Sequence, residues 1–384
     1  MQHDFKIHKE SVQVNGLDYE LETGKWARQA DGSVLLRWGN MLLMANATGA
    51  KKSGEGLDFF PMTVEYREKY YAGGRFPGGF LKRENRPSDK EILVSRVIDR
   101  PIRPLFPENY FNEVQIFITL LSAQKNFSAD VHAITAASAA LTISGLPFDG
   151  PVAGVRIARV AGKFILFPNR DEIAASDINL ALAGTIKAVT MIEGLADEAS
   201  EEDMIAAVKH GHEEIKRLCE MQLKLKAKAG KPRIDVPAAP DHSELRKRIA
   251  DLGMAAMKQA NEIKGKFERQ AAIDAAKKSV LEQFKPEFAA LEKDAAEKQE
   301  KLVKSLIADL EVDVVRNQIF HDAVRADGRK LDEIRPISVE VGVLPGAHGS
   351  ALFTRGETQS LGVLTLGTES NAQGTDDVEG ESSS

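Results

Sequence analysis

The sequence predicts an α/β (α+β) protein in which one α/β unit occurs twice, with a small all-helical domain between the copies. Three observations lead to this prediction. Short runs of alternating apolar and polar residues, typical of strands, fill residues 1–194. Residues 243–320 are almost all helix formers. Beyond residue 325 the strand-like alternation returns, together with a repeat of an early segment.

The first unit contains strand-like runs with turn residues between them, at 12–21, 33–46, 62–66, 114–121 and 152–167. A first helix begins at Ser88, where Glu91 three residues later completes a capping-box pattern, and we expect Pro101 to stop it. A second helix, 129–144, is rich in alanine and serine and is closed by Gly145. Its small side chains predict tight packing against a sheet.

A long amphipathic helix follows from Ser200 to about Gly230, and its Cys219 is interpreted as a small core residue. Three prolines make 231–242 an extended linker. In the helical domain, Lys and Glu alternate around sparse apolar residues, and Pro286 is expected to be the only internal break. We interpret these charges as a solvated face rather than a binding site.

The internal repeat has a constant offset of 317 residues. Residues 32–40, GSVLLRWGN, match 349–357, GSALFTRGE, and the strand 42–48 that follows matches 359–365. The second copy has too few residues to complete a unit, so we expect strand 361–366 to have exposed edges and no covering helix. We therefore interpret the chain as a fragment of a longer protein. The predicted boundaries are 1–230 for the first unit, 231–242 for the linker, 243–322 for the helical domain and 323–384 for the incomplete second unit.

Composition predicts a soluble cytoplasmic protein with no membrane partner. The N-terminus has no apolar secretory region, and no run approaches the roughly 20 apolar residues of a membrane span. The single cysteine excludes an internal disulfide and fits a reducing compartment. Among the eight histidines only 210 and 212 are closely spaced, and on a helix they point to different faces, so we predict no metal site.

The charge pattern identifies one candidate binding surface, residues 67–103, which we call the basic segment. Ten cationic and five acidic side chains give it a net charge of +5 in a chain of net charge −6. Charge concentrated against the overall balance is typical of an anion-binding surface. Its glycines and prolines place part of this charge on a loop, where Phe80 precedes Leu81, Lys82 and Arg83. Cations that contact phosphates beside a ring that stacks on a base suit single-stranded nucleic acid.

Arg96, Arg100 and Arg103 follow at spacings of four and three residues, close to one helical face. Two interpretations remain open. These arginines line a path for nucleic acid, or they hold the loop through ion pairs with Asp99 and neighbouring carboxylates.

Five motifs in this order resemble the N-terminal portion of the bacterial polynucleotide phosphorylase (polyribonucleotide nucleotidyltransferase) family. They are GRFPGGF at 74–80, RPS at 86–88, RVIDRPIRPLFP at 96–107, GKPR at 230–233 and GSALFTRGETQ at 349–359. The resemblance implies two ribonuclease-PH-like domains flanking a helical domain, the second of them truncated here. It also implies a homotrimeric ring around a channel for single-stranded RNA, and participation in an RNA-degradation complex.

The reaction that the resemblance implies is 3′-to-5′ phosphorolysis of mRNA. Inorganic phosphate is the co-substrate, nucleoside diphosphates are released, Mg²⁺ assists, and the reverse reaction synthesises polyribonucleotides. In the family, the metal-binding aspartates and a lysine belong to the second domain, which implies that they lie beyond residue 384. The corresponding place in the first copy, 177–184, has Asn179 and Ala181, which supply neither a good Mg²⁺ ligand nor a cation. We therefore expect no catalytic residue in this chain, no activity of the chain alone, and a loop or cap role for Asp177.

By the same resemblance, residues 80–83 form a constriction loop that grips RNA. The RNA-binding residues that we expect are Phe80, Lys82, Arg83, Arg86, Arg100 and Arg103. Arg355 and Thr358 lie near the expected phosphate position, although a plain role in a hairpin fits them equally well. The family commonly has two aromatics and two arginines in this loop, so Leu81 and Lys82 predict a weaker grip. The alternative function is a non-catalytic RNA-binding ring subunit of the same fold.

Overall fold

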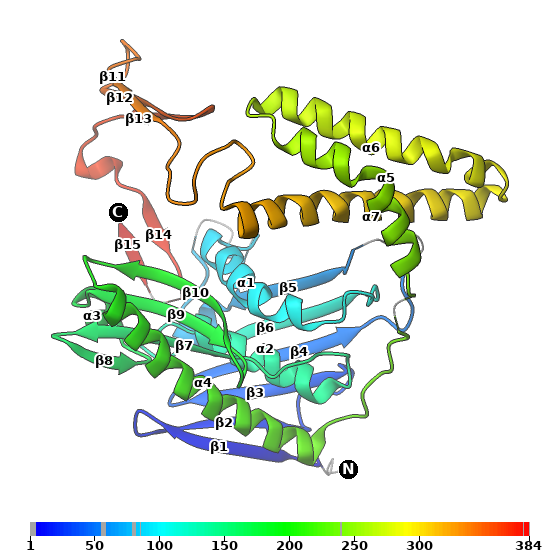
Figure 1. The fold of residues 1–384 in the computed structure, drawn as a ribbon. Coiled ribbons are helices and arrows are strands. Elements are labelled where there is room, and N and C mark those ends of the chain that lie inside the picture. Colours follow the sequence, from blue (N-terminus) through cyan, green and yellow to red (C-terminus); the bar gives the residue numbers. More distant parts are fainter. Residues whose placement is uncertain are drawn as a thin grey trace. The chain divides into compact units, whose positions relative to one another are not determined.

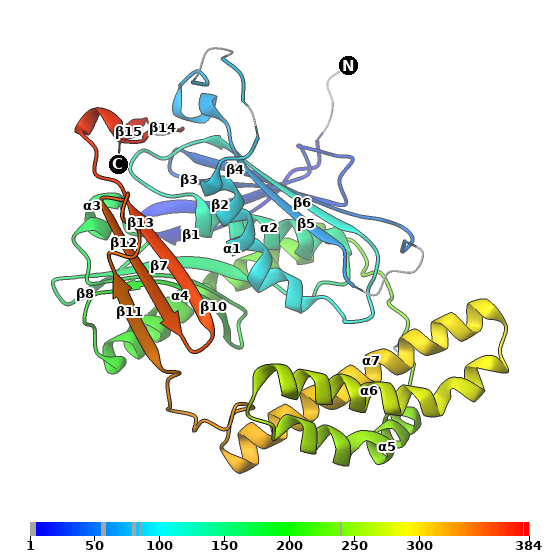
Figure 2. The same ribbon diagram turned by 90° about the horizontal axis from the view of Figure 1, so that it is seen from above.

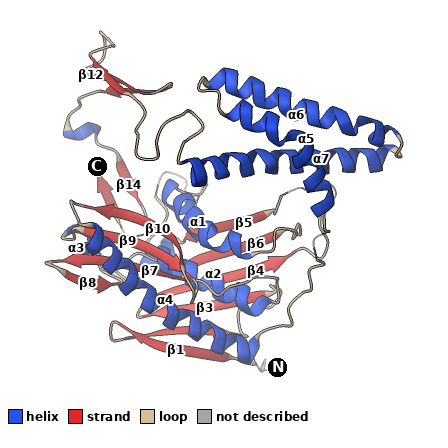
Figure 3. Cartoon of the chain, viewed as in Figure 1, coloured by secondary structure: helices blue, strands red, loops and turns tan. Residues whose placement is uncertain are grey.

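The computed structural model describes residues 5–54, 59–78, 82–84, 86–238, 240–378 and 380–383. The chain divides into two compact units, Met1–Ala238 with Ala372–Ser384, and Ala239–Asn371. Figure 3 separates helices from strands and shows the mixed α/β character of the chain. Within the described residues, no helix is both long and apolar enough to cross a membrane.

The first unit is built on two sheets (Figure 1). The larger sheet has the order β1 (His8–Val14), β2 (Leu17–Thr23), β3 (Gly32–Trp38), β4 (Met41–Gly49), β6 (Val114–Ser122), β5 (Met62–Glu68). Only β5 runs parallel to its neighbour in this sheet. The smaller, antiparallel sheet has the order β10 (Val189–Ala196), β9 (Ile178–Gly184), β7 (Ala153–Val160), β8 (Lys163–Leu166).

Helix α2 (Asp130–Ser144) lies between the two sheets and contacts β3, β4 and β7. Every residue from 131 to 144 is buried, which confirms the tight packing predicted from its small side chains. Helix α4 (Glu201–Ala229) covers β1, β7 and β9, and Cys219 on it is fully buried, as predicted. Burial raises the pKa of the Cys219 thiol to about 12, so this residue packs as a small apolar side chain.

Three of the longer strand-like runs are hairpins. In the first, Asn15 and Gly16 form the turn between β1 and β2, with φ of 50° and 75°. Asn-Gly readily adopts this left-handed backbone, which matches the twist of the flanking strands. A similar turn at Ala161 and Gly162 joins β7 to β8.

Helix α1 (Asp89–Ile102) packs beside β5 and begins as predicted. The Ser88 side chain accepts a hydrogen bond from the Glu91 amide, and the Glu91 carboxylate accepts one from the Ser88 amide. The expected stop at Pro101 is wrong, because Pro101 lies inside the last turn and is followed by a short 3-10 helix, η2 (Arg103–Leu105). So close to the helix end, the missing proline N–H affects only the final turn. The short elements of this unit are η1 (Tyr70–Gly73) and α3 (Arg170–Ala174).

The second unit contains three helices, α5 (Ser243–Asn261), α6 (Lys266–Ala289) and α7 (Lys293–Asn317), which Figure 2 shows side by side. Their apolar faces share a core that includes Met257, Phe284 and Val303. The expectation that Pro286 is the only break is wrong. Pro286 lies inside α6, and the helices are separated instead at 262–265 and 290–292. A π-helical turn, η3 (Gln318–Asp322), follows α7.

A three-stranded antiparallel sheet completes the second unit, in the order β11 (Ile337–Val341), β12 (Gly349–Arg355), β13 (Thr358–Leu364). Gly349 pairs with Leu364, and at the offset of 317 this is the pairing of Gly32 with Ala47 in the first copy. The hairpin therefore recurs in the same register, which confirms the internal repeat. Apolar side chains from 361 to 366 are half or more exposed, as expected for strands without a covering helix. A 3-10 turn, η4 (Glu369–Asn371), follows the sheet.

The last described residues form a small hairpin, β14 (Gly374–Asp376) and β15 (Glu381–Ser383), that packs on the first unit. We call residues 374–383 the acidic hairpin because its sequence includes Asp376, Asp377, Glu379 and Glu381. Val378 at its tip is 4% exposed and belongs to the core of the first unit.

Candidate nucleic-acid interface

The basic segment runs along one edge of the larger sheet. It starts on β5, continues through η1 and the loop after it, and ends with α1 and η2. The capping box fixes where the loop becomes a helix, and β5 fixes where the loop begins. The basic segment therefore has a regular element at each end, β5 and α1, with a loop between them (Figure 1).

Carboxylates of the same segment pair with several of its cations. Lys90 lies 2.8 Å from Glu68, and Lys69 is paired with Glu84. Glu91, which is 7% exposed, lies 3.6 Å from Arg67 and also accepts a hydrogen bond of 2.8 Å from the Glu68 amide. These pairs hold the start of α1 against the end of β5, so the cations in them are structural.

Four cations of the basic segment have no such partner among the described residues: the exposed Arg96 on α1, and three on the loop. Lys82, Arg83 and Arg86 are exposed, and no carboxylate of the described residues pairs with any of them. Lys82 has a φ of 48°, a left-handed backbone that is uncommon for a lysine and marks a tight turn in the loop. The predicted stacking residue Phe80 and its neighbour Leu81 lie outside the described residues.

Arg103 and Arg100 make different contacts. The Arg103 guanidinium holds Asp99 at 2.8–2.9 Å and donates to the carbonyl oxygens of Phe60 and Met62 at 3.0 and 2.9 Å. It therefore ties α1 to the start of β5, as the ion-pair interpretation expects. Arg100 is exposed and pairs with Glu193 on β10.

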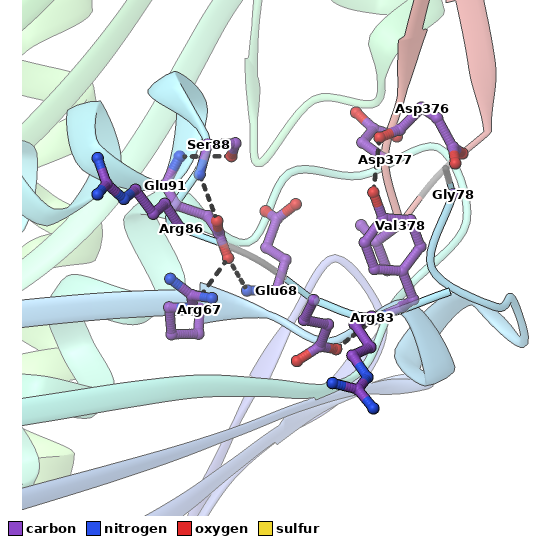
Figure 4. A pocket seen from close by; sticks show the side chains of 12 residues that line it. Arg67, Glu68, Gly78, Arg83, Arg86, Ser88, Glu91, Asp376, Asp377 and Val378 are labelled. Atoms are coloured by element: carbon purple, nitrogen blue, oxygen red, sulfur yellow. Dashed lines mark hydrogen bonds and ion pairs between the residues drawn. The ribbon is translucent and has the colours of Figure 1, made fainter. Parts of the chain in front are cut away.

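A cavity of about 320 Å³ lies beside the loop and carries charges of both signs (Figure 4). It is lined by Arg67, Glu68, Tyr70, Gly78, Arg83, Glu84, Arg86, Ser88, Glu91, Asp376, Asp377 and Val378. Figure 4 shows the acidic hairpin on one side of this cavity and the start of α1 on the other. No local sequence pattern predicts this contact, because Arg75 and Asp376 are 301 residues apart.

The contact with the acidic hairpin is specific. Arg75 Nη2 lies 2.7 Å from Asp376 Oδ1, and the Tyr70 hydroxyl donates to the Asp376 carbonyl oxygen at 2.9 Å. Burial raises the pKa of Tyr70, and the nearby Asp376 and Asp377 carboxylates raise it further, so the hydroxyl keeps its proton.

Asn179, in the segment 177–184, contacts an internal cation. Arg156 on β7 donates to Asn179 Oδ1 at 2.9 Å and pairs with the buried carboxylate of Asp130. Burial works to raise the pKa of Asp130, but Arg156 and the Val131 amide outweigh it, and the pKa is lowered. The amide oxygen of Asn179 is already bonded to a guanidinium, and the buried Ala181 supplies no ligand, so these residues do not fit Mg²⁺.

Asp177 also has a structural role. It pairs with Arg159 at 2.7 Å, and Arg159 reaches Asp203 on α4 at 2.6 Å. Hydrogen bonds from Arg159 lower the pKa of both carboxylates. Within the described residues, no three His, Cys, Asp or Glu side chains are grouped to hold a metal ion.

Arg355 and Thr358 face each other across the β12–β13 hairpin in the second unit. Both are exposed, and Arg355 lines a shallow hollow together with Arg325, Arg329 and Arg335. Three ion pairs join different helices of that unit: Arg246 with Asp309 at 2.9 Å, Arg248 with Glu287, and Lys277 with Glu311.

Comparison with known proteins identifies three family models along the chain. The model described as 3′ exoribonuclease family, domain 1, matches twice, at residues 17–147 and 333–383. Domain 2 of the same family matches 150–214. The model described as polyribonucleotide nucleotidyltransferase, RNA binding domain, matches 244–330. The duplicated match agrees with the internal repeat. The polyribonucleotide nucleotidyltransferase model covers the helical domain, whose charges the sequence pattern indicates to be a solvated face.

Curated relatives cover nearly the whole chain. The polyribonucleotide nucleotidyltransferase of Leptospira biflexa is 48% identical over 94% of this chain, and that of Geotalea uraniireducens is 46% identical over 97%. The alignments cover 51% and 53% of those relatives, so the chain spans about half their length. A crystal structure of rice (Oryza sativa) Rrp46 aligns with 58% of this chain and 95% of that chain, at a TM-score of 0.43 and 15% identity.

Proposed function

The chain belongs to the polyribonucleotide nucleotidyltransferase family and matches its N-terminal portion, and on this basis we propose that it is the RNA-guiding part of a phosphorolytic 3′-to-5′ exoribonuclease. The whole protein releases nucleoside diphosphates from mRNA, with inorganic phosphate as co-substrate, and runs in reverse as a polymerase. It acts in the cytoplasm as a homotrimer, within an RNA-degradation complex.

The observation that carries the RNA-guiding role is the set of cations without carboxylate partners. Lys82, Arg83 and Arg86 lie together on an exposed loop, while Arg67, Lys69 and Lys90 of the same segment are paired. Unpaired cations on a loop can contact phosphates without first breaking an internal ion pair. Arg100 on α1 and Arg103 at the start of η2 lie beside this surface, and Arg103 acts by holding α1 in position.

We assign no chemical step to the described chain. Arg156 and Asn179 fill the place where the family's metal ligands are expected, so the first domain does not fit Mg²⁺. In this proposal, Mg²⁺ and the inorganic phosphate bind to a complete second domain. The same observation favours the second candidate, a non-catalytic RNA-binding ring subunit.

The product of poly(A) degradation tests the proposed activity. The protein encoded by the whole reading frame is incubated with poly(A), phosphate and Mg²⁺, and the 384-residue chain is the matched control. We expect ADP from the whole protein, in proportion to added phosphate, and none from the control. AMP release without a phosphate requirement would indicate hydrolysis and contradict the proposal, and RNA binding with no product would favour the non-catalytic candidate.

A further inference from the structure

The acidic hairpin is seated on the first unit through one of its residues. Asp376 is held twice, by Arg75 at its carboxylate and by Tyr70 at its carbonyl oxygen, at 2.7 and 2.9 Å. Val378 anchors the tip, because it is 4% exposed and packs in the core of the first unit. The hairpin therefore places a carboxylate at a defined position instead of lying loosely on the surface.

Two glycines of the GGRFPGG motif, at 73–79, permit this approach. A Cβ at Gly73 would lie 1.9 Å from the Val378 carbonyl oxygen, and one at Gly78 would lie 2.0 Å from Asp376 Oδ2. Both distances are far below van der Waals contact. A side chain at Gly73 would displace the backbone of the hairpin, whereas one at Gly78 would displace the Asp376 carboxylate. This close contact gives the two glycines a role that the RNA-guiding function alone does not explain.

The seated carboxylate lies on the surface assigned to RNA. Asp376 lines the same cavity as Arg83 and Arg86, two of the cations without carboxylate partners (Figure 4). Carboxylate and phosphate oxygens accept hydrogen bonds from the same arginine and hydroxyl donors. The side chains of Arg75 and Asp376 are about 30% and 27% exposed, and ion pairs of this kind contribute little net free energy. A phosphate can therefore replace the carboxylate.

We propose that Arg75 and Tyr70 form an anion site for a backbone phosphate of the RNA, and that Asp376 of the acidic hairpin occupies this site until RNA displaces it. The inference rests on the proposed function, since it adds a contact and an internal competitor to the same surface. The hairpin lowers the apparent affinity for RNA because only the undocked fraction of the protein has a vacant site.

The competition between Asp376 and RNA is tested by titrating a fluorescent oligoadenylate with the protein and following its anisotropy. Asp376→Asn keeps the size of the side chain and removes its charge. We expect this variant to bind RNA roughly two- to fivefold more tightly, the size expected when one partly exposed ion pair stops competing. Gly73→Ala should act in the same direction without changing any charge, because its Cβ displaces Val378. Glu369→Gln, which removes one charge from the exposed turn η4, is the matched control and should leave the affinity unchanged.

The proposed phosphate contact of Arg75 is tested in a variant that lacks the competing Asp376 carboxylate. In the Asp376→Asn background, Arg75→Ala should weaken binding and reduce the slope of log affinity against log salt by about 0.7, the value for one phosphate contact on a single strand. An unchanged slope in that background would overturn the phosphate site.

Failure of the inference can be told apart from failure of the proposed function. If Lys82→Ala/Arg83→Ala weakens RNA binding while Asp376→Asn and Gly73→Ala match the wild type, the competitor is overturned and the RNA-guiding role stands. If neither the wild type nor any variant binds the oligonucleotide at low salt, both are overturned.

Discussion

His132 on α2 shows how strongly the core of the first unit acts on one titratable side chain. Its ring lies 4.8 Å, between centroids, from Trp38 and from Phe167, and its Nδ1 is 3.2 Å from the Tyr19 hydroxyl. The pKa of His132 is lowered to about 4, mainly by burial; Asp130 opposes this shift and Arg156 adds to it. The imidazole is therefore neutral in the folded protein at neutral pH.

This pKa predicts a loss of stability in acid. Between pH 6.5 and about 4 the unfolded chain binds a proton at this residue and the folded chain does not, so the free energy of unfolding falls as the pH falls. The full contribution is about 3 kcal/mol. His132→Phe removes the titrating group and keeps a ring in the aromatic cluster.

Urea denaturation of both proteins across this pH range measures the effect. We expect the wild type to lose about 3 kcal/mol more than the variant between pH 7 and 4. Parallel pH profiles would show that His132 is protonated in the folded state.

Residue pairs that are distant in the sequence could not be predicted from it. Arg75 and Asp376 are 301 residues apart, and no local pattern connects them. The contacts of Arg156 with Asn179 and Asp130 likewise depend on the fold, and no local pattern around this strand residue predicts them. The cations of the basic segment could be found from the sequence as a group, because their charge opposes that of the whole chain. Which of them are paired depends on tertiary contacts.

At the scale of elements, the closest packing in the first unit is between α2 and the strands that flank it. A Cβ at Gly32, the first residue of β3, would lie 2.0 Å from the Ala140 carbonyl oxygen, and one at Gly154 on β7 would lie 2.4 Å from that of Val131. The alanines of the helix and the glycines of the strands together allow it to lie between two sheets.

Gly32→Ala should therefore destabilise the first unit by about 1–3 kcal/mol, the usual cost of overpacking a core. Gly374→Ala is the control, because nothing lies within 4 Å of a Cβ placed there. Chemical denaturation monitored by tryptophan fluorescence reports the change, because Trp38 is buried beside α2 and becomes exposed to solvent on unfolding. Equal stabilities of the two variants would mean that the sheet and helix separate at little cost.

Elements with local determinants were predicted well. The capping box at Ser88 and Glu91 fixes the start of α1 within four residues of sequence, and the repeat predicted a hairpin that β12 and β13 form in the expected register. The predictions that Pro101 and Pro286 break their helices are wrong. Pro101 and Pro286 both lie close to a helix end, where losing one backbone hydrogen bond is tolerated.

At the scale of the whole molecule, the two copies differ in what covers them. Leu36 in the first copy is fully buried, while Phe353, its counterpart at the offset of 317, is 40% exposed. Ala47 and its counterpart Leu364 differ in the same way, at 0% and 57%. The first copy has α2 over these positions, and this difference supports the proposal that the activity belongs to a longer protein.

The distribution of charge over the chain supports the claim that the basic segment binds RNA. An overall charge of −6 repels RNA, so binding depends on the basic segment and above all on cations that are not already paired. Such binding must weaken steeply with salt, because each phosphate contact releases counterions.

The salt dependence of poly(A) binding, measured on the wild-type chain and on Lys82→Ala/Arg83→Ala, tests this claim most directly. The control is Lys51→Ala/Lys52→Ala, which removes two exposed lysines outside the basic segment. We predict weaker binding for the first variant only, with a slope of log affinity against log salt reduced by about 1.4, or about 0.7 for each lost contact. An unchanged slope, or an equal loss in the control, would contradict the account.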